Sequence, residues 1–486
     1  MQYKYVVLTN TTIGGFMSLL DANIVLVSLP RIILTLPGTS PLDGIWIILS
    51  YTLVTAVLLL TMGRLADLFG RVRLYNLGFV VFTIGSGLCS IAPNGITLIA
   101  FRLVQGVGAA LIWSNNAAII TDAFPATERG RALGINQVAG ISGSIVGLVA
   151  GGVLTQELGW RSIFWINLPI GVFATVWAYL KLRDVNPPIK GEGVDIIGNS
   201  LFAAGLTLLL VGLTLGAING WSGTQISEIV LGLGLLGLFA FAETRVKNPM
   251  MDVALFRIKP FLAGVTANLL NSISRGSISL ILVFYFQGVL LYDVLTTGIL
   301  LIPFSLAFIV CGPVSGYFSD RYGPRGFAVT GTIISGVALL LFSLLPYDVP
   351  YTTLVVPMVL AGAGGGIFVA PNVSALMGAV PAARRGIAAG VSSTLFSVGS
   401  LLSLGLVFAV FAASVPTQAL QAIFAGQPPP AGSLDISSFV EGMHHLYLIM
   451  AAVCFLTLIP ASQTGTRKPK PTVVYDKQVS PHMEPA

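Results

Sequence analysis

Charged residues are scarce in this sequence, in which Asp, Glu, Lys and Arg together make up 9% of 486 residues. A soluble globular domain carries roughly a quarter of its residues as charges, so this composition excludes a soluble domain. Hydrophobic residues reach 55%. They form successive apolar runs of about 20 residues, long enough for a helix to cross a bilayer, without the alternation of β-barrel strands. The sequence therefore predicts an all-α, polytopic transmembrane protein.

Reactive and ligand-binding side chains are equally sparse. The three cysteines, Cys89, Cys311 and Cys454, lie inside apolar runs, which argues against a disulfide framework or a metal site. The sequence has no G-x-x-x-x-G-K-[ST] loop, which argues against a nucleotide-driven pump. Histidine, cysteine and carboxylate side chains do not gather at one membrane depth. We therefore expect no enzyme activity, no catalytic residue, no metal and no cofactor.

The apolar runs also predict an orientation. With the N-terminus inside, 21 of the 25 Lys and Arg residues fall on the cytoplasmic side, as the positive-inside rule requires. The net charge of +6 thus reflects topology and not nucleic-acid binding. The first run is too long for a cleavable signal, and we expect a plasma-membrane protein with both termini in the cytoplasm. The fourteen predicted spans lie roughly at 6–29, 45–63, 74–92, 96–120, 134–155, 162–181, 196–217, 227–243, 261–287, 297–317, 327–345, 352–377, 387–411 and 442–460.

A short charged turn occurs twice. GRLADLFGRVR at 63–73 and GYFSDRYGPR at 316–325 share the spacing Gly-x-x-x-Asp-x-x-Gly between long apolar runs. Glycines permit a tight turn, an aspartate can accept hydrogen bonds from a helix N-terminus, and arginines hold the turn in the cytoplasm. The repetition predicts an internal duplication, and two ordinary basic loops are the alternative. The residues that carry the turns are Gly63, Asp67, Gly70, Arg71, Gly316, Asp320, Arg321, Gly323 and Arg325.

Two charges lie deep in the first half of the chain. By the helical rise, Asp21 is roughly 13 Å and Arg102 about 9 Å below the outer surface. A charge at this depth costs several kcal/mol unless it faces a cavity or a partner. Their similar depth suggests that the two side chains pair. The alternatives are a structural aspartate bonded to a neighbouring helix and an arginine that reaches outward or binds loop carbonyls.

Small residues are spaced along the fifth predicted span. Small residues recurring every four positions form a groove that admits another helix backbone closely. The outer loop that follows, WRSIFWINLP at 160–169, has tryptophans suited to the membrane interface. The predicted helix-packing residues are Gly143, Gly147, Gly151 and Gly152.

Together these segments resemble a known family. The turn at 63–73, RLVQGVG at 102–108, the glycine spacing and WRSIFWINLP are similar to the major facilitator superfamily. More narrowly, they resemble its fourteen-span drug:proton antiporters, which also show an aspartate in the first span. The resemblance covers nearly the whole chain. It implies that the two charged turns gate the cytoplasmic side by latching the helix ends in the outward-open state.

The positions of the two turns imply two six-span bundles and an insertion. The turns end spans two and ten, so two spans have been inserted between the halves. Leu148 and Ser114 stand where the family usually has proline, and Phe396 where many relatives carry arginine. These departures weaken the expectation of ordinary multidrug export more than that of transport. The predicted domains are an N-terminal six-span bundle at 1–185, linkers and two additional spans at 186–258, a C-terminal six-span bundle at 259–462, and a disordered cytoplasmic tail at 463–486.

A polar band crosses the ninth span. Asn268, Asn271 and Arg275 lie near mid-membrane, and the second half has no deep acid to neutralise the arginine. We expect these residues to line a substrate cavity, where Arg275 attracts an anionic group, pairs with Asp21 or lies near a bound lipid. A bond to backbone carbonyls is the structural alternative.

The sequence thus predicts a secondary transporter that exports amphipathic small molecules or drugs in exchange for protons, by alternating access. Protonation of Asp21 from outside would break its pair with Arg102, and proton release toward the cytoplasm would restore it. The expected partners are a small-molecule substrate, protons and the lipid bilayer, with no nucleic acid, and we expect a monomer. The alternatives are a transporter for a specific metabolite, organic anion or lipid, and a non-transporting membrane sensor.

Overall fold

The computed structural model describes residues 2–125, 128–184, 195–219, 221–246, 249, 251, 253–346, 349–381, 385–416, 419, 423 and 436–464. Within these ranges the regular secondary structure is helical, and fourteen segments are long and apolar enough to cross a membrane. The prediction of an all-α polytopic protein with about fourteen spans is confirmed. The predicted domain boundaries stay predictions, and most of the first linker and of the tail, residues 185–194 and 465–486, lie outside the described residues.

The helices of the first half form six spans, of which the sixth is divided. They are α1 (Tyr3–Thr35), α2 (Pro41–Phe69), α3 (Arg71–Ser90), α4 (Gly95–Ala123), α5 (Arg129–Glu157), α6 (Ser162–Trp165) and α7 (Asn167–Lys181). The two spans that follow are α8 (Ile196–Asn219) and α9 (Gly223–Glu243). The second half comprises η1 (Val253–Arg257), α10 (Lys259–Arg275), α11 (Ile278–Phe284), the π-helix η2 (Tyr285–Val289), α12 (Val294–Leu300), α13 (Ile302–Tyr322), α14 (Pro324–Ser343), α15 (Tyr351–Ala379), α16 (Arg385–Ser414), α18 (Ile436–Leu456) and α19 (Leu458–Ala461).

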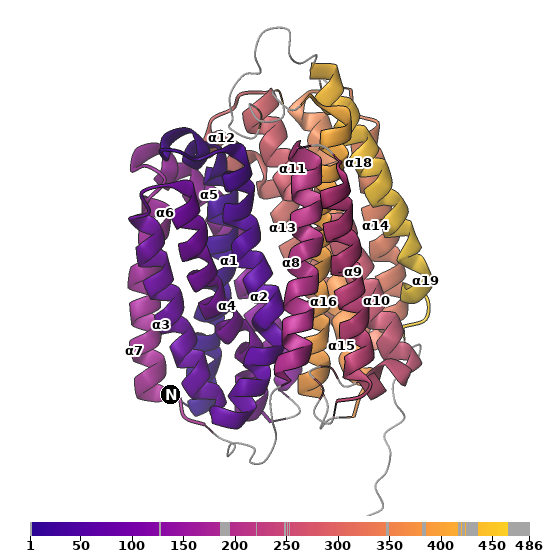
Figure 1. Ribbon diagram of the computed structural model, residues 1–486. Helices are drawn as coiled ribbons and strands as arrows, with labels where there is room; N and C mark the ends of the chain where they lie inside the picture. The colour runs from indigo at the N-terminus through magenta and orange to yellow at the C-terminus, as the bar shows by residue number, and fades with distance from the viewer. Residues whose placement is uncertain are drawn as a thin grey trace, which may run out of the picture.

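The two halves lie side by side, and each half forms a separate group of helices whose axes are roughly aligned (Figure 1). The same hydrogen bond occurs in both. Asn116 of α4 donates from Nδ2 to the carbonyl oxygen of Thr11 on α1 over 2.8 Å, and Asn372 of α15 donates to that of Gly264 on α10 over 3.0 Å. The repeated packing of the first and fourth spans of each half supports the predicted duplication.

The two charged turns have the same backbone geometry. Gly70 directly follows α2 with φ 103°, and Gly323 directly follows α13 with φ 95°. Residues with a side chain rarely adopt this conformation, so glycine is required at both positions. In each case the next helix begins directly afterwards, which reverses the chain within one residue.

The ninth span is broken where the sequence suggested one continuous helix. α10 ends at Arg275, and α11 begins at Ile278 and passes into the π-helix η2. Gly276 lies at the break against α16, and a Cβ atom there would lie 2.9 Å from Cα of Ser400. Short π-helical segments inside α-helices occur often at functional sites. The break separates α10 from the second part of the span, α11 and η2, which contacts the first half of the molecule.

The two additional spans cover one side of the boundary between the halves. α8 packs against α2 of the first half and α16 of the second, and Thr61 on α2 donates to the side-chain oxygen of Asn199 on α8 over 2.8 Å. α9 packs on the outer side of α8, and Figure 1 shows both helices in front of the two groups. The insertion therefore bridges the halves on this face.

Candidate functional site

Asp21 and Arg102 form an ion pair inside the first half. One guanidinium nitrogen of Arg102 on α4 lies 2.5 Å from Oδ2 of Asp21 on α1, and both side chains are fully buried. The pairing expected from their similar depth is therefore present. Arg102 is also bonded through Nε to the carbonyl of Ile47, and its guanidinium lies over the ring of Tyr51 at 4.2 Å.

Two amides complete the surroundings of the Asp21 carboxylate. Gln105 and Asn167 each donate from their side-chain nitrogen to Oδ1 of Asp21 over 2.8 Å. Gln105 also accepts a 2.7 Å bond from Arg102, one turn earlier on the same helix face. The desolvation of a buried ion pair is offset only when further hydrogen bonds satisfy its lone pairs, and these amides supply them.

Neither amide was among the predicted site residues. The contact of Gln105 with the ion pair could be predicted from the sequence, because Gln105 lies three residues after Arg102 and so shares its helix face. Asn167 was included in the outer-loop stretch WRSIFWINLP, and no role was predicted for it. It instead begins α7, where its side chain also donates to Ser86 on α3 over 3.1 Å. Only the packing of α7 against α1 and α3 reveals its role.

The glycines of α5 contact both halves of the molecule. A Cβ atom at Gly147 would lie 2.6 Å from the carbonyl oxygen of Leu20, the residue before Asp21. Gly143 and Gly151 face the same helix one turn away on either side. Gly152 points elsewhere, because a Cβ atom there would lie 2.6 Å from Cα of Leu295 on α12. α5 therefore packs tightly against the helix that carries Asp21 and against the opposite half.

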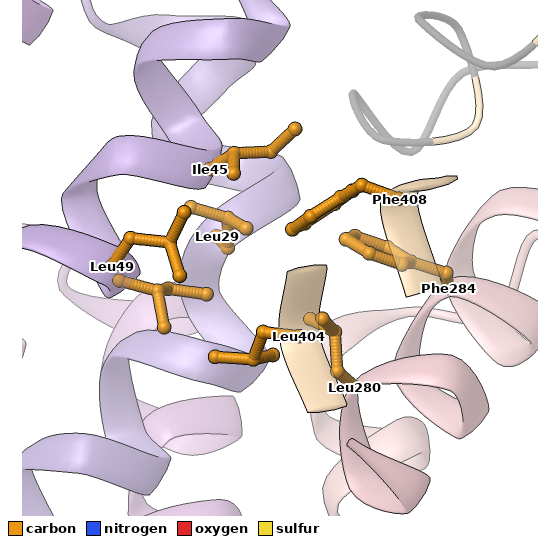
Figure 2. A pocket seen from close by; sticks show the side chains of 8 residues that line it. Leu29, Ile45, Leu49, Leu280, Phe284, Leu404 and Phe408 are labelled. Atoms are coloured by element: carbon orange, nitrogen blue, oxygen red, sulfur yellow. The ribbon is translucent and has the colours of Figure 1, made fainter. Parts of the chain in front are cut away.

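An apolar contact closes the end of the molecule where α12 lies, opposite the N-terminus (Figure 1). Figure 2 shows side chains of α1 and α2 facing those of α11 and α16 across a crevice too narrow to admit a water molecule. We call this contact the apolar seal. It consists of Leu29, Ile45, Ile48, Leu49, Leu280, Phe284, Leu404 and Phe408.

One polar contact between the halves lies beside the apolar seal. The side chain of Gln287 in the π-helix η2 donates to the carbonyl oxygen of Val27 on α1 over 3.0 Å. Gln287 is buried. This bond ties the upper part of the ninth span to the first half.

The first charged turn forms a network inside its own half. Arg71 binds Asp67 at 2.9 Å and Asp122, near the end of α4, at 2.7 Å. The N-terminus of α3 is bound by Asp184, which accepts from the backbone N–H of Val72 over 2.8 Å. In this conformation the Asp67 carboxylate is held by Arg71, and its binding to a helix N-terminus in the outward-open state stays a prediction. Gly63 faces Ser114 at an ordinary contact distance.

The second charged turn is more open. Gly316 faces Ala370 of α15 at an ordinary contact distance, and Arg321 and Arg325 are exposed. The guanidinium of Arg321 lies 5.7 Å from the ring centre of Tyr322. The side chain of Asp320 lies outside the described residues.

The polar band of the ninth span lies inside the second half. Asn268 donates to the backbone carbonyl of Ser392 on α16 over 3.1 Å. Arg275 donates to the carbonyl of Ala361 on α15 over 2.7 Å. The suggestion that Arg275 pairs with Asp21 is wrong in this conformation, because Asp21 is held by Arg102, Gln105 and Asn167.

Comparison with known proteins assigns the family. The model of the Major Facilitator Superfamily matches residues 11–244 and 264–479. The chain belongs to the Major Facilitator Superfamily. It is 31% identical to the riboflavin transporter RibZ of Clostridioides difficile (strain 630) over 94% of this chain and 97% of that relative. It is 33% identical to the multidrug resistance protein Stp of Mycobacterium tuberculosis over 83% of this chain and 75% of Stp.

A solved structure of an auto inhibited POT family peptide transporter shares the fold of this Major Facilitator Superfamily chain. Its TM-score is 0.65 at 16% identity, with 94% of this chain and 96% of that chain covered. The resemblance inferred from the motifs is thus confirmed, and the protein is a membrane transporter of this superfamily.

Proposed function

We propose that this transporter exports amphipathic small molecules or drugs across the plasma membrane in exchange for protons. The observation that carries the proposal is the buried pair of Asp21 and Arg102, because an ionisable pair inside a membrane bundle is costly and marks an ion pathway. The similarity to a multidrug resistance protein supports export of drugs. In this proposal both termini are cytoplasmic and the transporter works as a monomer.

The proton site consists of the Asp21 carboxylate and its three donors. Binding of a proton neutralises the carboxylate and leaves Arg102 without its counter-charge, which favours a different arrangement of α1 and α4. Removing one charge from a buried pair costs about 3–5 kcal/mol, enough to change the balance between two conformations more than a hundredfold. Protons entering from outside and leaving toward the cytoplasm would drive substrate outward.

Alternating access requires a gate on each side of the membrane. With the N-terminus in the cytoplasm, the apolar seal and the Gln287 contact close the outer side in this conformation. We assign cytoplasmic gating to the two charged turns. Through its glycines, α5 packs closely against both the helix of Asp21 and α12 of the other half. A movement of α1 that follows protonation of Asp21 can therefore be transmitted through α5 to the outer gate.

The test uses the purified protein in liposomes that contain a pH-sensitive dye, with the cation ethidium and the anion dansyl-leucine as separate substrates. Asp21→Asn keeps the shape of the side chain but cannot exchange a proton, so substrate-driven proton flux should vanish. The matched control is Glu157→Gln, which makes the same change at an exposed position at the end of α5 and should keep full flux. Full proton coupling in Asp21→Asn would refute the assignment.

A second candidate is a carrier of one metabolite, which the riboflavin transporter supports by matching 94% of this chain. Transport of riboflavin by liposomes that transport neither ethidium nor dansyl-leucine would favour this alternative. Transport of ethidium and other unrelated amphipathic compounds favours the exporter.

A further inference from the structure

Arg275 is a cation inside the second half whose guanidinium is poorly satisfied. Within the described part of the chain it makes no ion pair, and its hydrogen bond goes to the carbonyl of Ala361. Its Nε atom is buried and has no hydrogen-bond partner. The ring of Phe308, 5.7 Å away, adds only a weak attraction. A buried donor of a charged group left without an acceptor is costly, so an acceptor is expected to occupy this place in some state of the protein.

The surroundings of Arg275 are shaped to hold the guanidinium. Gly365 on α15 lies directly against it, because a Cβ atom at that position would overlap the guanidinium group. Gly365 belongs to a run of small residues at 361–366, a pattern that allows a close helix crossing. In the structure it also makes the room in which the arginine head is fixed.

A second unused donor lies on the same face of α10. Asn271 is four residues before Arg275, one helical turn away, and its Nδ2 atom is buried without a partner. Both unsatisfied groups donate hydrogen bonds. A ligand that satisfies them must therefore offer oxygen acceptors, and a carboxylate fits a guanidinium because it can accept two parallel bonds.

The location is suitable for a substrate. Arg275 ends α10 at the break of the ninth span, and the next residue, Gly276, is exposed. Leu280, five residues after Arg275 and just beyond the break, is part of the apolar seal. The unsatisfied donors of Arg275 and Asn271 thus lie next to the apolar seal, on the side of the seal that faces the end of the molecule with the N-terminus.

The charge of Arg275 determines which class of substrate this place in the second half favours. Asp21 and Arg102 cancel each other, so Arg275 contributes an uncompensated positive charge to the membrane interior of the described chain. A cationic drug would be repelled from this charge, whereas an anion would neutralise it. We propose that Arg275 and Asn271 form an anion-binding subsite, and that the preferred substrates are amphipathic organic anions with a carboxylate. This proposal rests on the proposed export function, because it assigns the substrate class of that transporter.

The test compares two fluorescent probes that differ by one charge, dansyl-leucine and its methyl ester. Binding to the purified full-length protein is followed by dansyl fluorescence, and transport is followed in liposomes. The wild type should bind the acid about tenfold to hundredfold more tightly than the ester, as for a hydrogen bond to a charged group. Arg275→Gln should abolish this preference without weakening ester binding, and Arg275→Lys should keep part of it.

Two controls separate the subsite from general effects of charge and folding. Arg31→Gln removes the same charge from an exposed position near the end of α1 and should keep the preference. Arg275→Gln should unfold at the same temperature as the wild type or higher, because it removes a half-buried charge that has no ion-pair partner in the described chain. A large loss of stability in Arg275→Gln, with the preference for the acid retained in this variant at the wild-type level, would indicate a structural arginine and overturn the proposal.

The outcomes distinguish this proposal from the export function. Proton-coupled export of ethidium without preferential binding of dansyl-leucine would retain the exporter and refute the anion subsite. Preferential binding that Arg275→Gln abolishes, without proton flux driven by either dansyl-leucine or ethidium, would retain the subsite and refute proton-coupled export. If phosphatidylglycerol in otherwise phosphatidylcholine vesicles eliminates the preference, the group bound is a lipid phosphate, which overturns the assignment to substrate.

Discussion

The close packing of α5 on α1 predicts opposite effects of the same substitution at two glycines of α5. A Cβ atom at Gly147 would lie 2.6 Å from the Leu20 carbonyl oxygen, whereas a Cβ atom at Gly134 would meet nothing within 4 Å. Gly147→Ala therefore forces α1 and α5 apart by roughly 0.8 Å, and gaps of this size forfeit a quarter to a half of the dispersion energy of neighbouring contacts. The expected cost is about 1–3 kcal/mol, as for other overpacked sites.

Gly134→Ala is the matched control, since it adds the same methyl group to the same helix in open space. It should stabilise the protein by about 0.5–1 kcal/mol, because alanine loses less backbone entropy than glycine in a helix. Thermal unfolding of both variants in one detergent should place Gly147→Ala below the wild type and Gly134→Ala at or above it. Proton flux should fall in Gly147→Ala, because Leu20 adjoins Asp21. Equal unfolding temperatures for the two variants would refute the close approach of α1 and α5.

Three further predictions concern single contacts. Gln287→Leu removes a hydrogen bond between the halves worth about 0.6–2 kcal/mol, so the outer side should open more often. In a background without the three native cysteines, a cysteine introduced by Leu29→Cys should then react faster with a membrane-impermeant thiol reagent. An unchanged reaction rate would contradict the role of this bond. Asn167→Ala removes a charge-assisted donor to Asp21 worth about 1.5–3 kcal/mol and should lower substrate-driven proton flux about tenfold or more, without loss of folded protein on size-exclusion chromatography. Asp184→Ala should lower thermal stability by about 0.5–2 kcal/mol through loss of the α3 cap, and Asp184→Asn should recover most of it if the hydrogen bond dominates over the charge.

The distinction between the two classes of glycine in α5 shows the limit of sequence reasoning. The four-residue spacing predicted a packing groove, and Gly143, Gly147 and Gly151 do face α1. The neighbouring Gly152 belongs to the same sequence pattern but faces α12 of the other half. A helix fixes which residues share a face, but the neighbour of each face depends on how all the spans pack.

The charged turns give a second example. Their glycines were predictable, because only a residue without a side chain readily adopts the positive φ of Gly70 and Gly323. The partner of the α3 N-terminus was not predictable, because Asp184 is more than a hundred residues away from Val72 in the sequence. The local backbone geometry follows from residue type. Which aspartate binds the N-terminus of α3 depends instead on how α7, which precedes Asp184, packs against α3.

The sequence by itself determined the fourteen spans, the superfamily and the deep pair of Asp21 and Arg102. Apolar length and helical rise fix how far along a span each residue lies, and depth alone brought these two charges to one level. Only the tertiary structure decided which groups from distant parts of the sequence lie beside each charge: Asn167 beside Asp21, and Gly365 against Arg275. These contacts depend on the rotation of each helix about its axis, which is set by packing against its neighbours and leaves no direct mark in a single sequence.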